Sequence, residues 1–180
     1  HLRTIEAQRD AVKARFECDK LYKEIVANQA LVDILGPEGL RRQKLVGAVG
    51  TFNQESLAPL CAAAKYPTVL IGEDLELSYG GRRYWLLSES EQYRAAAVLR
   101  IGIAQSDGSP ICIFDRADVL DEEGRNGLFD MLCSVADMGF LVAMTLDEPK
   151  HAPNLAEAGV GNTYWIAKGI SSPLTAACTT

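Results

Sequence analysis

The spacing of apolar residues changes character along the chain, and each change predicts a different element. From Leu2 to about Ala30 the sequence is rich in charges, lacks glycine and proline, and places apolar residues at helical intervals. Arg9 and Asp19 interrupt the heptad seam, after which its phase shifts. The pattern predicts a long helix, either an ordinary amphipathic helix or one arm of a coiled coil, that stops at "LGPEG".

A second helix is predicted from Arg41 through Lys65, with Pro59 marking a break or a kink. The next stretch, "TVLIGEDLELSYGGRRYWLL", begins with an apolar run and then alternates between apolar and polar residues. It turns at Gly80–Gly81 and resumes from Tyr84 to Leu87. This pattern predicts a β-hairpin.

After Leu87 the apolar residues form long runs rather than alternations. Ser88 opens a helix that extends to about Ala104, and buried strands are predicted at Ile111–Asp115 and Phe140–Thr145 with a helix between them. A last strand is predicted at Thr163–Lys168. Helices alternating with buried strands indicate an α/β fold, with a mostly parallel sheet flanked by helices and a small antiparallel hairpin.

Composition narrows the class of protein. Of the 180 residues, 48% are hydrophobic and 23% are charged, which suits a compact domain and argues against disorder. The net charge of -6 argues against a chain whose whole surface binds nucleic acid or anionic lipid. Five cysteines without CxxC spacing indicate neither a disulfide framework nor a zinc site. The cysteine pattern also indicates a reducing cytosol, and no apolar run approaches the ~20 residues of a membrane span, so we expect a cytoplasmic protein without a membrane partner.

The stretch Ser88-Glu89-Ser90-Glu91 allows two interpretations. It fits the S-x-x-E capping box, in which Ser88 accepts from the Glu91 amide and the Glu91 side chain reaches back to the Ser88 amide. A helix N-terminus with serine hydroxyls and free amides also attracts anions. Two acids at such a position suit a phosphate site only if they are held away from the phosphate.

The second motif, "PICIFDRADVLD", places Asp115 at the end of an apolar strand and Asp121 six positions later. In P-loop nucleoside triphosphatases a strand-end aspartate of this kind holds the water shell of Mg²⁺ beside the phosphates. Its order in the chain, after the Ser88 helix and before another apolar strand, favours this interpretation over a chance match.

Together these motifs resemble the ATP-binding-cassette ATPase head of the SMC, RecF and SbcC type. "LSESEQYR" resembles the family's signature motif, "ICIFDRADVLD" its Walker B strand and D-loop, and "FLVAMT" the strand before its switch loop. The "DRADVLD" form is most similar to phage and prophage members. The resemblance covers roughly residues 35–168 and implies that the chain is the C-terminal lobe of the head, with the first helix as its coiled-coil arm.

The resemblance implies ATP and Mg²⁺ as cofactors. It assigns Asp115 to the Mg²⁺ shell, and Ser88 to the γ-phosphate of a nucleotide bound by an opposing head, with Ser90 and the helix amides beside it. Glu91 is counted with these two serines as a nucleotide-binding residue. Ser88 and Asp115 then serve different nucleotides and lie far apart within one chain. The implied partners are an N-terminal lobe with the P-loop, a second head, and DNA engaged by the whole complex. The implied process is DNA repair, recombination, or chromosome or phage DNA maintenance.

Several residues depart from the family pattern, and two glycines of the family's signature motif are here Glu89 and Ser90. No G-x-x-x-x-G-K-[ST] occurs in the 180 residues. Arg116 stands where the family has its general-base glutamate, and Leu146 stands where it has the switch histidine. Asp118 is the nearest acid that can replace the base, although a structural role suits it equally, and Asp121 is the expected D-loop acid at the dimer interface. We therefore expect these departures to impair rapid ATP hydrolysis more than they impair the ATP-dependent association of two heads.

The expected organisation is an arm at residues 1–34, a head lobe at 35–168 and a flexible tail at 169–180. The alternative function is a catalytically degenerate head that senses nucleotide or only dimerises. A third possibility is an unrelated α/β binding domain with a capped helix.

Overall fold

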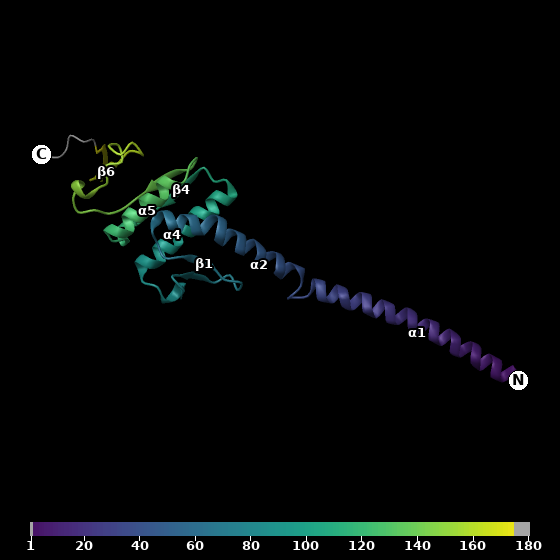
Figure 1. The fold of residues 1–180 in the computed structure, drawn as a ribbon. Coiled ribbons are helices and arrows are strands. Elements are labelled where there is room, and N and C mark those ends of the chain that lie inside the picture. The colour runs from purple at the N-terminus through teal and green to yellow at the C-terminus, as the bar shows by residue number, and fades with distance from the viewer. Residues whose placement is uncertain (1, 175–180) are drawn as a thin grey trace. The chain divides into compact units, whose positions relative to one another are not determined.

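The computed structural model describes residues 2–174 and divides into two compact units, one up to Val49 and one from Gly50 onward (Figure 1). The first unit contains α1 (Leu2–Leu35) and the larger part of α2 (Leu40–Phe52). The helix α1 ends at the "LGPEG" turn, as the sequence predicts.

No residue of α1 is buried. The helix has exposed apolar side chains along most of its length: Leu2, Ile5, Val12, Phe16, Leu21, Tyr22, Ile25, Val26, Leu31, Val32, Ile34 and Leu35. A helix in water gains most of its stability from packing an apolar face. The apolar residues of α1 therefore suit a partner helix, and a coiled-coil arm remains a prediction.

The second helical region bends without breaking at its proline. α2 passes into the π-helical turn η1 (Asn53–Leu57) and then α3 (Ala58–Ala64). Pro59 lies in the first turn of α3, where its missing N–H and fixed φ are tolerated. The irregularity predicted at Pro59 thus appears as a π-helical turn just before it.

An antiparallel sheet follows, made of β1 (Val69–Ile71), β2 (Leu77–Tyr79) and β3 (Arg82–Arg83). Gly80 and Gly81 form the turn with φ of 56° and 77°, values that favour glycine. The predicted return strand from Tyr84 to Leu87 is wrong, because Tyr84–Leu86 forms the 3-10 helix η2. The Gln92 amide donates to the carbonyls of Tyr84 and Leu87 and so binds this turn to the next helix.

The centre of the second unit is α4 (Glu89–Asp107), β4 (Ile111–Phe114), the 3-10 turn η3 (Ala117–Val119), α5 (Glu122–Ser134) and β5 (Gly139–Val142) (Figure 1). β4 and β5 pair in parallel with Phe114 opposite Val142. The α/β fold class predicted from the sequence is confirmed. The core joins these elements to α3 and β1, and its fully buried side chains include Val69, Val98, Ile101, Phe114, Leu128 and Met131.

One face of the β4–β5 pair lacks a covering layer within the described residues. Ile111, Ile113 and Leu141 are 54%, 57% and 51% exposed, and Ile113 lies opposite Leu141. In the part of the chain that the structure describes, parallel pairing is limited to these two strands, which is less than the mostly parallel sheet we expected. Parallel sheets are normally covered on both faces.

The last elements are η4 (Pro149–His151) and a hairpin of β6 (Tyr164–Ala167) and β7 (Ile170–Pro173). β7 falls within the predicted tail of residues 169–180, so that segment begins with a paired strand; residues 175–180 lie outside the described residues. Between positions 2 and 174, no helix has both the length and the apolar character needed to cross a membrane.

Candidate functional site

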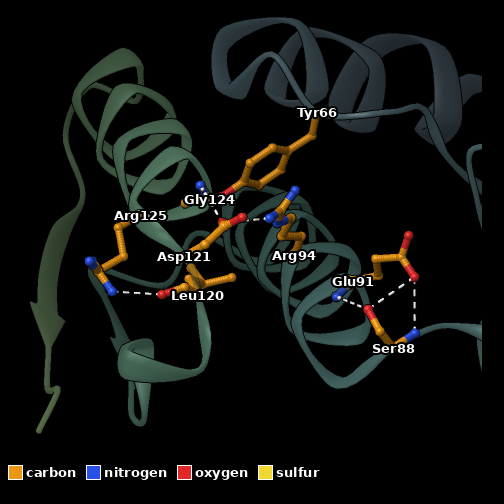
Figure 2. Close-up of polar contacts among 8 residues, drawn as sticks. All are labelled: Tyr66, Ser88, Glu91, Arg94, Leu120, Asp121, Gly124 and Arg125. Carbon is orange, nitrogen blue, oxygen red and sulfur yellow. Dashed lines mark hydrogen bonds and ion pairs between the residues drawn. The ribbon is translucent and has the colours of Figure 1, made fainter.

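Ser88 begins α4 with a capping box. Its hydroxyl accepts a hydrogen bond from the Glu91 amide at 3.4 Å, and the Glu91 carboxylate accepts one from the Ser88 amide at 2.9 Å (Figure 2). The Ser88 hydroxyl also lies 3.1 Å from the same carboxylate oxygen. The capping box predicted from the sequence is therefore present, and the Ser88 side chain remains exposed at the helix end.

Both acids of this motif are paired with arginines. Arg82 of β3 donates to the second oxygen of Glu91. The Glu89 carboxylate accepts a 2.9 Å hydrogen bond from the Arg116 guanidinium. Pairing with arginine reduces the repulsion that a free carboxylate would exert on a phosphate at this helix end, although the capping box itself occupies the Ser88 hydroxyl and the amides of Ser88 and Glu91.

Ser90 lies differently from Ser88. Its hydroxyl is buried and has no hydrogen-bond partner within the part of the chain that the structure describes. A buried hydroxyl without a partner is unusual and unfavourable. Rotation about the Cα–Cβ bond is needed before this hydroxyl can meet a ligand.

Asp115 lies at the carboxyl end of β4 and lines a cleft of about 360 Å³ between that strand and the first turns of α4. The Tyr93 hydroxyl donates to the Asp115 carbonyl at 2.9 Å, and the Arg116 amide donates to the Asp115 carboxylate at 2.9 Å. Glu89 and Arg116 also line the cleft, and Ser88 does not. Arg116 links the end of β4 to the start of α4, because its amide bonds to Asp115 and its guanidinium to Glu89, whereas Ser88 and Asp115 do not line one cleft.

The other two predicted acids lie outside the lining of this cleft. Asp118 accepts a 3.1 Å hydrogen bond from the Thr145 amide and so ties η3 to the segment after β5. Asp121 is the N-cap of α5 and accepts a 2.9 Å bond from the Gly124 amide. That bond, with help from Arg94, lowers the pKa of the Asp121 carboxyl below its usual value.

Arg94 joins α4, on which it lies, to the start of α5 (Figure 2). Its guanidinium donates to Asp121 at 2.7 Å and lies over the Tyr66 ring, 5.5 Å from the ring centre. The Tyr66 hydroxyl in turn donates to the Gly124 carbonyl. A Cβ at Gly124 would lie within 2.9 Å of the Arg94 nitrogens, so only glycine leaves room for this arrangement.

Sequence reasoning missed Arg94, Arg82 and the pairing of Glu89 with Arg116. Arg94 carried a usable signal, because it is a basic residue on the largely apolar face of a helix beside the quoted motif. The pairing of Glu89 with Arg116 joins residues 27 positions apart, and no local pattern reports it.

The residues at the cleft fit one part of an Mg²⁺–ATP site. Asp115 offers a single exposed carboxylate, and Mg²⁺ is usually bound through one or two carboxylates together with waters and phosphates. Within residues 2–174, no three His, Cys, Asp or Glu side chains gather in a group that holds a metal. Further ligands would have to come from the nucleotide, water and a P-loop.

Comparison with known proteins supports the fold. No family model and no curated protein matches the chain. Solved structures do match, and one was described under the words "Structural biochemistry of ATP-driven dimerization and DNA stimulated activation of SMC ATPases". It has a TM-score of 0.52 and 15% identity, and the match covers 74% of this chain and 88% of that chain. The chain thus shares the fold of an SMC ATPase head structure.

The Ser88–Glu91 contact makes stability depend on pH. The Ser88 amide and Arg82 lower the pKa of the Glu91 carboxyl, so its contribution is complete above the usual glutamate pKa and is lost as pH falls through the lowered value. We expect Glu91→Gln to lower the melting temperature at pH 7 and to lower it less at an acid pH below the lowered pKa. Thermal unfolding followed by circular dichroism measures this, with Glu6→Gln in α1 as the control. An equal loss at both pH values would contradict it.

Proposed function

We propose that this chain is the C-terminal lobe of an SMC/RecF-like ATPase head, and that it completes a composite ATP site across a dimer of heads. The missing half is a lobe with a P-loop, since the 180 residues contain none. ATP would join two heads because each site needs a P-loop from one and a signature helix from the other. DNA would be engaged by the assembled complex, since this lobe is acidic.

The open face of β4 and β5 is the observation that carries the proposal. Two parallel strands with Ile111, Ile113 and Leu141 half exposed do not make a finished sheet. Within the described residues neither strand pairs with a third one, so the sheet can be extended at its edges as well as covered on its face. A second lobe that supplies strands and a covering layer satisfies both needs.

In this proposal Asp115 holds the Mg²⁺ shell, because it is exposed at the carboxyl end of a parallel strand. Ser88 and the first amides of α4 contact the γ-phosphate of the nucleotide in the opposing head, with Ser90 beside them. Glu91 shapes that helix end through the capping box, and Asp121 places the D-loop at the interface through its bond to Arg94.

The first test uses the chain alone and then with its missing lobe. We expect titration calorimetry of the isolated 180 residues with ATP and Mg²⁺ to show no micromolar binding, because the phosphate-cradling P-loop is absent. Adding the P-loop lobe should produce nucleotide binding and ATP-dependent dimers measured by light scattering. Micromolar affinity of the isolated chain, or a complete head that ignores ATP, would contradict the proposal.

A second candidate function is a degenerate head that dimerises with ATP but does not turn it over. The observation that favours it is Arg116, whose guanidinium occupies the position of the general base and is paired with Glu89. A guanidinium remains protonated at neutral pH and cannot accept a proton from water. ATP-dependent dimers with no measurable phosphate release would support this candidate.

A further inference from the structure

Two of the residues at which this chain departs from the signature and Walker B patterns contact each other. Glu89 stands at a signature position that is glycine in the resembled family, and Arg116 stands at the position of the base. Their side chains meet at 2.9 Å. The pair lies in the cleft that Asp115 also lines.

We propose that Arg116 binds the γ-phosphate of the nucleotide whose Mg²⁺ Asp115 holds, and that Glu89 occupies its guanidinium until that nucleotide arrives. This inference rests on the proposed function. It assigns to Arg116 a binding role in place of the proton transfer that a glutamate would perform there.

The position of Arg116 supports a phosphate ligand. It directly follows Asp115, so its side chain starts one residue away from the carboxylate assigned to the metal. Its backbone is left-handed, with φ of 57°, and the guanidinium is directed into the cleft toward Glu89 rather than packed in the core. Guanidinium groups bind phosphates through paired, charge-assisted hydrogen bonds.

The pair with Glu89 is weak enough to be exchanged for a phosphate. The two side chains are 67% and 69% exposed, and ion pairs between exposed groups contribute about 0–1 kcal/mol. A γ-phosphate beside Mg²⁺ carries more charge than one carboxylate. The neighbouring Arg100 lines the same cleft and adds positive charge to it.

ADP lacks the γ-phosphate, so the ratio of ADP to ATP dissociation constants isolates this contact from general effects on folding or nucleotide binding. The experiment uses the complete head, this chain with its P-loop lobe, and titrates slowly hydrolysed ATPγS and ADP in the presence of Mg²⁺. Arg116→Asn is the test variant, because asparagine tolerates a left-handed backbone. Arg83→Asn is the matched control, since Arg83 is similarly exposed at 64%, lies outside the cleft, and contacts only side chains away from it, through a long 3.7 Å ion pair with Glu76 and a position over the exposed Trp85 ring.

We expect Arg116→Asn to weaken ATPγS binding by about 10- to 100-fold, as loss of a hydrogen bond to a charged group does, and to leave ADP binding unchanged. Glu89→Gln, which releases Arg116, should strengthen ATPγS binding by up to about fivefold. An unchanged ratio in Arg116→Asn, or equal losses for both nucleotides, would overturn the inference while the proposed function stands. A wild-type head that binds neither nucleotide would instead reject the proposed function itself.

Discussion

Replacing Phe114 by alanine should lower the free energy of unfolding by about 3–5 kcal/mol, the usual cost of deleting a buried phenyl ring. Phe114 is fully buried, ends β4, and lies 6.4 Å from the ring of Phe140 between ring centres. Its loss leaves a cavity between the sheet and α4, directly before Asp115. Urea unfolding of the isolated chain measures the change.

Two further variants give this measurement its controls. Phe114→Leu keeps most of the volume and should cost less than about 1.5 kcal/mol. Ile113→Ala changes the residue directly before Phe114, and the Ile113 side chain lies on the exposed face of the sheet. It should cost no more than about 0.5 kcal/mol in the isolated chain. If Ile113→Ala were as costly as Phe114→Ala, the face that we describe as open would be covered within this chain.

The second large effect concerns hydrolysis in the complete head. If Asp118 accepts the proton of the attacking water, Asp118→Asn should lower ATP turnover by about 10²–10⁴-fold and leave ATP-dependent dimers intact. Asparagine retains the oxygen that accepts the Thr145 amide, so the variant separates the chemical role from the structural one. Asp115→Asn should weaken nucleotide binding as well, because it removes a ligand of the Mg²⁺ shell.

Steady-state phosphate release, paired with sizing of the ATP-bound dimer, distinguishes these outcomes. Asp130→Asn on α5 provides a control in which an exposed aspartate is changed away from the cleft. Unchanged turnover in Asp118→Asn would mean that Asp118 is not the base. Its role would then be structural, as the acceptor of the Thr145 amide. The head would then be a slow switch in which Arg116 holds the nucleotide.

The sequence predicted the helices and the parallel strand pair because their signals are local. The stop at "LGPEG", the capping box at Ser88 and the apolar runs of β4 and β5 each depend on residues within a few positions of one another. Tyr84–Leu86 was mistaken for a strand because its aromatic composition favours strands, while the contacts of Gln92 with Tyr84 and Leu87 decide the conformation.

The candidate site was predictable only in part for the same reason. Asp115 and Ser88 follow from motifs, and their places at a strand end and a helix start agree with the sequence. The neighbours that set their environment, Arg94 beside Asp121 and Arg116 beside Glu89, come from segments 27 residues away in each case. A motif search records which residues are present, and the folded chain determines which charges are neutralised.

The π-helical turn before Pro59 has a consequence for aggregation. It presents Asn53 to the outer edge of β1, where the amide group donates to the Ile71 carbonyl at 2.9 Å and accepts from the Ile71 amide at 3.0 Å. The Asn53 side chain thereby makes the hydrogen bonds that a neighbouring strand would make. It occupies an edge of the sheet to which strands of other chains could otherwise add. Asn53→Ala should therefore promote fibre-like self-association through β1, whereas the edges of β4 and β5, which pair with no third strand among the described residues, can accept a strand from a partner.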